Sequence, residues 1–186
     1  MKVIFQNVRL SYPHLFTEDK YGKHSCSLIL DKVDNKKQID DLNAAVKAEM
    51  LEKFGAKSVA METALRADKQ KCCIKDGDTF LTGQGEPLAP GCVVVSCNRK
   101  PTAAPLQLLD GKKVAITQDG ILYAGCYVNA SLEIWGQTGE YQGIRGTLNG
   151  LQFAGEGERF GGAPVPTSDD FEPLETGEEA GDFNDL

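Results

Sequence analysis

A chain of 186 residues, of which 41% are hydrophobic and 25% charged, has room for one domain with a real core plus an extension, and too little for two full domains. No apolar run approaches the ~18 to 20 residues of a membrane helix, and the first residues lack a signal peptide's apolar region, so we expect a cytoplasmic protein without membrane contact. The net charge of −7 is unevenly distributed along the chain. Eight of the 27 acids lie in residues 168–186, which contain no base, so the rest of the chain has 19 acids and 20 bases. The body can therefore carry a local positive groove.

Two strands are expected near the N-terminus. The first covers Lys2 to Tyr12, and the second, Lys23 to Asp31, alternates apolar and polar residues with a clear period of two. The loop between them, Pro13 to Gly22, carries an unusual number of aromatic and basic residues. These are His14, Phe16, Lys20 and Tyr21.

One helix is expected from Asn35 to Phe54, because apolar residues recur there every three or four positions. Asp34 is a plausible N-cap and Gly55 follows as a stop. A turn at residues 75–78 and a Gly/Pro-rich loop at 83–91 then lead to a strand from Cys92 to Arg99.

The stretch from Ile121 to Trp135 separates two surfaces of different character. Its even positions form an uninterrupted apolar row, which we expect to face the core. The odd positions place Tyr123, Tyr127 and Trp135 on the opposite face among small and polar neighbours. Alternatively, these aromatic residues form a second core face or a dimer interface, because buried tyrosines are common.

A second strand, Tyr141 to Phe153, is expected to pair with this one across the turn 136–140, with Ile144 and Leu148 in the inner row. Such a hairpin would expose the platform of aromatic rings on which the bases of single-stranded nucleic acid stack, while lysines and arginines contact phosphates. The candidate binding residues are Tyr12, Phe16, Lys23, Arg99, Lys100, Lys113, Tyr123, Tyr127, Trp135, Tyr141 and Arg145.

The C-terminal part changes in composition. We expect an ordered domain over residues 1–154 and a disordered, Gly/Pro-rich acidic tail over 155–186. The negative charge of the tail resembles that of a DNA strand, so we expect the tail to bind transiently in the binding groove when nucleic acid is absent. The alternative is a tail that only aids solubility. Isolated apolar residues among acids are natural anchors for a partner protein, and the candidates are Asp182, Phe183, Asp185 and Leu186.

The sequence gives little support for a catalytic site or a metal site. The chain has two histidines, no phosphate-binding GxxxxGK[ST] loop, no nucleophile elbow and no CxxC pair. We therefore expect no enzyme, no cofactor and no metal, and we expect the six cysteines to be reduced, several of them as small core residues.

An ordered series of segments resembles a family of phage OB-fold single-stranded-DNA-binding proteins, long catalogued as a domain of unknown function. The segments are residues 9–16 (RLSYPHLF), 22–23, 27–32 (SLILDK), 76–78 (DGD), 123–128 (YAGCYV) and 143–148 (GIRGTL). The resemblance covers Lys2 to about Phe160.

The resemblance implies a mainly β fold with one or two helices, built on an OB-like five-stranded barrel with extra elements. It also implies sequence-independent binding of single-stranded DNA in phage replication, recombination or repair, with partner proteins bound through the tail. The chain departs from the acidic-tailed phage proteins that end in an aromatic residue, because Phe183 is followed by Asn184, Asp185 and Leu186. Two alternatives stay open: an RNA-binding or recombination-mediator module, and a phage structural or assembly protein whose aromatic face joins subunits, for instance in a homodimer.

Overall fold

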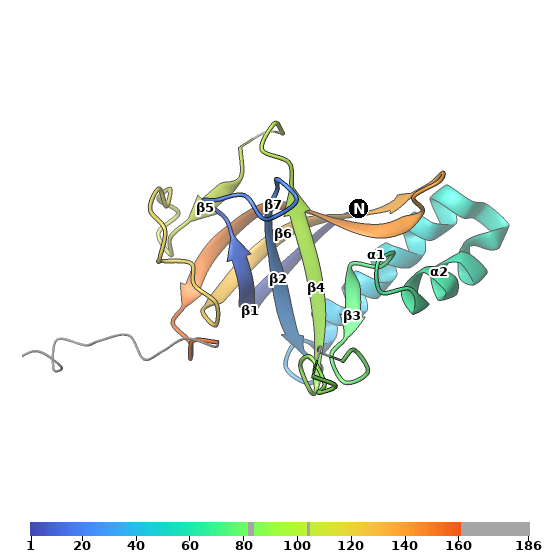
Figure 1. The fold of residues 1–186 in the computed structure, drawn as a ribbon, viewed down its shortest axis with the longest axis horizontal. Helices are drawn as coiled ribbons and strands as arrows, with labels where there is room; N and C mark the ends of the chain where they lie inside the picture. The colour runs from blue at the N-terminus through green and yellow to red at the C-terminus, as the bar shows by residue number, and fades with distance from the viewer. Residues whose placement is uncertain (82–83, 104, 161–186) are drawn as a thin grey trace, which may run out of the picture.

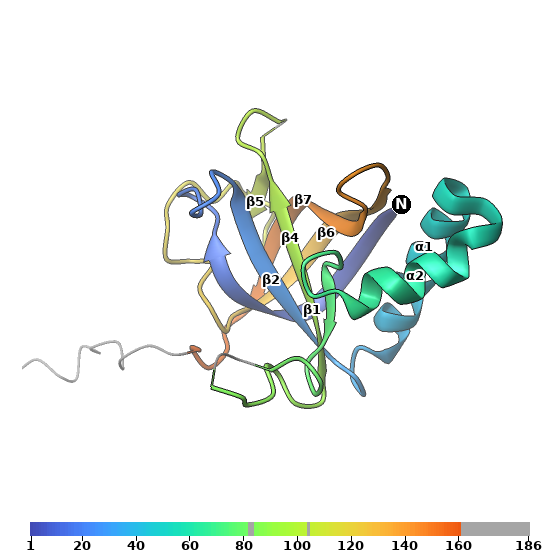
Figure 2. The same ribbon diagram turned by 45° about the vertical axis from the view of Figure 1, so that its right-hand side comes forward.

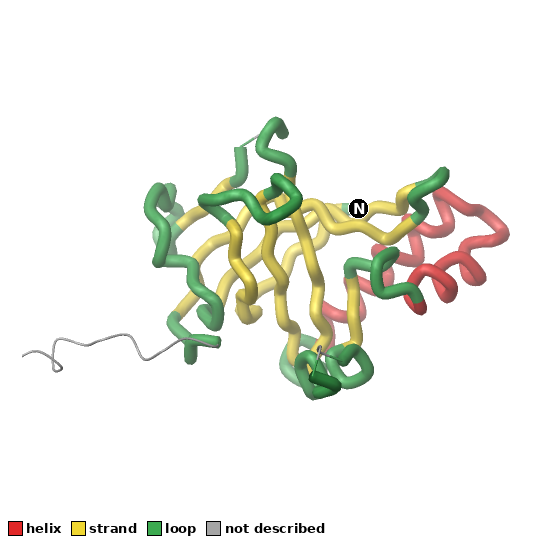
Figure 3. Tube along the Cα trace, viewed as in Figure 1, coloured by secondary structure: helices red, strands yellow, loops and turns green. Residues whose placement is uncertain are grey.

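The structure, a computed structural model, describes residues 1–81, 84–103 and 105–160, so the predicted tail beyond residue 160 lies outside the described residues. Within these ranges the chain is mainly β, with seven strands, two α-helices and a short 3-10 helix (Figures 1 and 3). In chain order these are β1 (Lys2–His14), β2 (His24–Asp31), α1 (Lys36–Phe54), η1 (Gly55–Lys57), α2 (Ser58–Ala67), β3 (Ile74–Asp76), β4 (Cys92–Arg99), β5 (Gln107–Leu109), β6 (Tyr127–Gln137) and β7 (Gly143–Gly155).

The strands form one sheet in the order β3-β4-β2-β1-β6-β7-β5, which curls until β4 also meets β7. Five strands, β1, β2, β4, β7 and β6, thus form a ring, as in the partly open Greek-key barrel of OB-folds. The closure is slight, because β4 and β7 share a single parallel pair, Asn98 with Thr147. β3 and β5 extend the sheet, and the two helices lie together on one side of the barrel (Figure 2).

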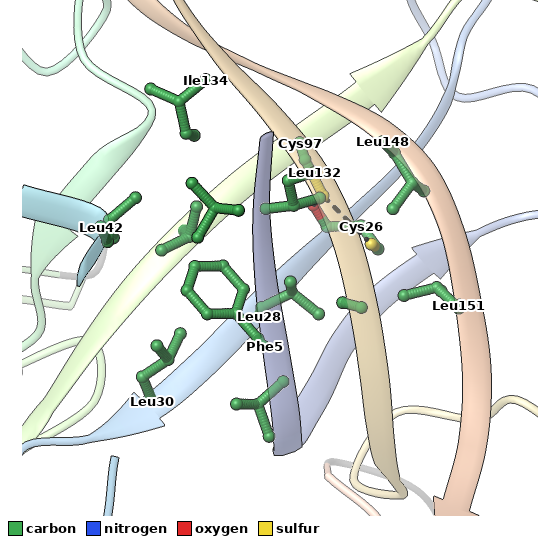
Figure 4. Packing of buried hydrophobic residues seen from close by; sticks show 14 of the residues in the cluster. Phe5, Cys26, Leu28, Leu30, Leu42, Cys97, Leu132, Ile134, Leu148 and Leu151 are labelled. Atoms are coloured by element: carbon green, nitrogen blue, oxygen red, sulfur yellow. Dashed lines mark hydrogen bonds between the residues drawn. The ribbon is translucent and has the colours of Figure 1, made fainter. Parts of the chain in front are cut away.

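The core fills the inside of this ring. The inner row predicted from alternation is confirmed along β6, where Val128, Ala130, Leu132 and Ile134 are all buried. They pack with Phe5 and with side chains of the other strands (Figure 4). The strand itself is shorter at its start than predicted, beginning at Tyr127 instead of Ile121. The reason is local: Gly125 adopts a φ of +107°, which interrupts an extended chain, and Ala124 is only partly buried.

Helix α1 closes one flank of the core with Leu42, Val46 and Met50. It begins one residue later than predicted, so its N-cap is Asn35 and the prediction of Asp34 is wrong. The Asn35 side chain instead accepts a hydrogen bond of 2.9 Å from the backbone N–H of Asp31, which ties the start of the helix to the end of β2. Among the described helices none is long and apolar enough to cross a membrane.

All six cysteines are free thiols. Cys26 and Cys97 face each other across the β2–β4 pair with their Sγ atoms 3.4 Å apart, inside the barrel (Figure 4). Burial raises the pKa of Cys73 to about 12, so this thiol stays protonated at neutral pH. Four of the thiols, Cys26, Cys72, Cys97 and Cys126, are buried in the core and behave as small core residues.

Candidate nucleic-acid interface

A groove of about 1440 Å³ runs over the outer face of β1, β2 and β4. Its floor is set by strand alternation: Cys26 and Leu28 point into the core, so Ser27 and Ile29 point outward, and Val94 and Ser96 do the same on β4. The floor is narrow and partly polar, with the Ser27 and Ser96 hydroxyls 3.3 Å apart. The two short serine side chains leave space above this part of the sheet.

One wall of the groove is a stack of two rings and a cation. The guanidinium of Arg9 lies over the ring of Phe160 and also over the ring of Tyr127, with its Cζ 4.4 Å and 5.1 Å from their centroids. Arg9 is also fixed by donating hydrogen bonds from Nε to the Gly125 carbonyl (2.7 Å) and from Nη2 to the Glu158 carbonyl (2.6 Å). This wall therefore presents aromatic faces around a positive charge held in one orientation.

The segment that carries Phe160 follows β7 and packs closely on the chain before β6. A Cβ on Gly125 would lie 2.0 Å from the Glu158 carbonyl oxygen, and one on Gly157 would lie 2.2 Å from the Gly125 carbonyl oxygen. Only glycine allows this backbone contact. The Phe160 N–H also donates to the Ala124 carbonyl at 3.0 Å, so this segment contacts the chain before β6 up to Phe160.

The opposite wall comes from the loop between β3 and β4. Phe80 lies at the groove with the ammonium groups of Lys75 and Lys69 4.6 Å and 4.7 Å from its ring centroid. The loop folds back tightly at Gly77, where a Cβ would meet the Ala89 carbonyl oxygen at 2.1 Å. Both walls thus combine aromatic rings with cations.

Tyr12 lines the groove from the end of β1 and is 70% exposed. Its φ of +46° is a left-handed conformation that a bulky residue rarely adopts, and it falls where the β1–β2 pairing shifts register. Backbone strain of this kind is concentrated at functional sites in proteins. Here it accompanies a large ring that is left open to solvent beside the groove.

The end of the groove near α1 is acidic, with Asp31 and Asp34 lining it. The backbone N–H groups of Asp34 and Val33 bind the Asp31 carboxylate and lower its pKa, so it stays ionised at neutral pH. A polyanion would be repelled at this end and attracted toward Arg9 and Lys75.

The binding residues predicted from the sequence lie in three places: in the groove, in a second pocket, and outside both. Tyr12 and Tyr127 line the groove, whereas Phe16, Arg99 and Lys100 line a second pocket of about 670 Å³. The other predicted residues lie in neither of these two pockets: they are Lys23 before β2, Lys113 after β5, Tyr123 before β6, and Trp135, Tyr141 and Arg145 at the β6–β7 hairpin.

The platform expected on β6 is therefore not one continuous surface. Tyr127 and Trp135 are eight residues apart on one strand, which corresponds to about 26 Å. Trp135 is 37% exposed and donates from Nε1 to the Thr147 hydroxyl at 3.0 Å. Tyr123 packs partly against the core, with the Arg159 guanidinium 3.9 Å from its ring centroid.

Four aromatic or cationic residues that line the groove were not among the sequence candidates: Arg9, Lys75, Phe80 and Phe160. Arg9 belongs to the recognisable segment 9–16, which was the one available signal. Lys75 lies in β3, Phe80 in the loop after β3, and Phe160 after β7, and they reach the groove only through long-range packing.

Comparisons with known proteins agree with this architecture. The sequence model of a family described as "Enterobacter phage Enc34, ssDNA-binding protein" matches residues 1–184. A "Putative protein p50" of Acyrthosiphon pisum secondary endosymbiont phage 1 is 29% identical, covering 96% of this chain and 97% of its own length.

Two solved structures share the fold. The single-stranded DNA-binding protein from bacteriophage Enc34 superposes with a TM-score of 0.71 at 23% identity, covering 92% of this chain and 90% of that one. The single-stranded DNA-binding protein gp2.5 of bacteriophage T7 has a TM-score of 0.53 at 17% identity, covering 97% and 100%. Because the family match spans nearly the whole sequence, the chain belongs to the family of the Enterobacter phage Enc34 ssDNA-binding protein.

Proposed function

We propose that the chain binds single-stranded DNA without sequence preference, in the groove over β1, β2 and β4. The observation that carries the proposal is the pairing of two aromatic and cationic walls on the face that corresponds to the nucleic-acid-binding side of OB-folds. The solved relative from bacteriophage Enc34 has also been determined "in complex with ssDNA", with a TM-score of 0.70.

Bases would stack on the rings that flank the groove. Every base has an aromatic face, so stacking on Tyr12, Phe80 or Tyr127 gives affinity without choosing a sequence, at about 1 to 3 kcal/mol per base. The phosphates would lie toward Arg9 and Lys75, where charge attraction gives a strong dependence on salt.

Some of the predicted binding residues lie outside the groove, and they fit a longer path of the bound DNA strand. Lys23 and Phe16 lie in or beside the loop between β1 and β2, and Tyr141 lies in the loop between β6 and β7. These are the two loops that frame bound strands in OB-folds. Trp135, Arg145 and Lys113 would contribute only if a long strand wraps beyond the groove.

The acidic tail would act on the same site. Phe160 lines the groove, so the tail starts at its edge, and the eight acids of residues 168–186 can compete with phosphates for the groove cations. When DNA displaces the tail, Asp182, Phe183, Asp185 and Leu186 become available to proteins of replication, recombination or repair in the host cytoplasm.

A titration tests the proposal directly. A fluorescently labelled dT oligonucleotide is added to the full chain at several salt concentrations, with RNA and duplex DNA as competitors. We expect tight binding at low salt that weakens steeply as salt rises, and poor competition by duplex DNA. Equal competition by duplex, or no binding at low salt, would contradict the proposed function.

A further inference from the structure

The second pocket lies at the mouth of the barrel and is distinct from the groove. It is bounded by Leu15 and Phe16 after β1, by His24 at the start of β2, and by Leu108 and Ile116 around β5. His24 lies two residues before the core residue Cys26 on β2, so both side chains are on the face that points into the barrel. Ser27 is on the opposite face and lines the groove. We call it the mouth pocket. Barrel mouths are common places for ligand sites.

The walls of the mouth pocket are mainly aliphatic and its edge is cationic. Leu15, Leu108 and Ile116 are buried, while Lys100 and Arg99 line the same pocket. Arg99 is oriented by donating to the Leu148 carbonyl and the Asn149 side chain, each at 3.1 Å. The pocket thus offers apolar contact beside positive charge.

One polar atom of a residue that lines this pocket lacks a partner. Nδ1 of His24 is buried and makes no hydrogen bond to any of the described residues. An unpaired buried polar atom costs free energy, so a polar group that reaches it on binding would be stabilised there.

We propose that the mouth pocket binds the last residues of this chain, Asp182 to Leu186. Phe183 or Leu186 supplies the apolar side chain, and the neighbouring carboxylates meet Lys100 at the cationic edge. The segment from 168 to 186 carries eight acids and no base, which complements the cationic edge. Mainly aliphatic walls suit such a side chain better than a nucleobase, which binds by stacking on aromatic rings.

The tail is long enough to reach. Twenty-six residues follow Phe160, and a segment of 26 residues can span up to about 90 Å when fully extended. A body of this size has a radius of gyration of about 15 Å, so every part of its surface is accessible without strain. A tail anchored at its tip is held close to the body, with its acidic stretch kept near the groove.

The test uses the full chain with its own anchors removed by Phe183→Ala and Leu186→Ala. A synthetic peptide of residues 179–186 is added, and methyl NMR signals of Leu108 and Ile116 are followed. We expect saturable shifts of these signals, and none with a peptide that carries the same two alanines. Lys100→Glu should weaken peptide binding at least fivefold, whereas Lys47→Glu, the same charge reversal at an exposed position of α1 that lines neither pocket, should leave it unchanged.

Three outcomes would overturn the proposal. The first is an absence of shifts up to millimolar peptide. The second is a set of shifts confined to groove residues and abolished by Lys75→Glu. In the third, a dT oligonucleotide shifts the mouth-pocket signals and the peptide does not, which would assign the pocket to nucleic acid. The peptide titrations contain no DNA. The peptide can therefore fail to bind while the chain still binds single-stranded DNA, and the peptide can bind even if the chain does not bind DNA.

Discussion

Replacing Tyr12 by alanine isolates the contribution of stacking in the groove. The ring is 70% exposed and lines the groove, so its loss should remove contact with a base while leaving the core intact. If one base stacks on it, the loss is about 1 to 3 kcal/mol, which corresponds to a fall in affinity of roughly 5-fold to 150-fold. Folding stability should change little, because most of the ring already faces solvent.

Tyr21→Ala is a matched control. Tyr21 is 72% exposed in the loop between β1 and β2, but it is not among the residues that line the groove. Fluorescence anisotropy with a labelled dT oligonucleotide at one fixed salt concentration measures both variants, and thermal unfolding checks their stability. Wild-type affinity in Tyr12→Ala, combined with a large loss in Tyr21→Ala, would refute the placement of DNA in the groove.

Further predictions address charge, packing and thiol chemistry. Lys75→Ala should reduce the slope of log K against log salt by about 0.7, as expected for one lost phosphate contact with a single strand; an unchanged slope would remove Lys75 from the site. Phe5→Ala should lower the free energy of unfolding in urea by about 3 to 5 kcal/mol, because the ring is fully buried. Gly125→Ala should release the segment before Phe160, seen as faster proteolysis there, since the new Cβ would lie 2.0 Å from the Glu158 carbonyl oxygen. With a pKa of about 12, Cys73 should resist alkylation at pH 8 until the protein is denatured, which mass spectrometry can follow.

Alternation within single strands predicted much of the fold. The buried rows of β2 and β6 and the extent of β4 follow from local period-two patterns, and α1 follows from its three-to-four spacing. Gly55 ends that helix as expected, with a φ of +52°. The position of helix α2 was not predicted; the helix has only ten residues, buries only Leu65 and follows α1 directly after the short 3-10 helix.

The candidate site was harder to predict, because it depends on which strands become neighbours. Alternation correctly placed Tyr127 opposite the inner row, but it could not show that Arg9 pairs with Tyr127 across β1 and β6. Alternation also could not predict that Phe80 and Phe160 line opposite sides of one groove, because they lie 80 residues apart in the sequence. Trp135, the most conspicuous aromatic residue in the sequence, lies instead at the far end of β6.

The location of the bound strand is tested most directly by photochemical crosslinking. A dT oligonucleotide in which each thymine is replaced by 5-bromouracil is bound to the full chain, irradiated, and mapped by mass spectrometry. We expect crosslinks at Tyr12, Phe80 and Tyr127, on the rings that flank the groove. Crosslinks at Trp135 and Tyr141 alone, with none at the groove, would show that the strand binds on the β6–β7 hairpin and would contradict the account.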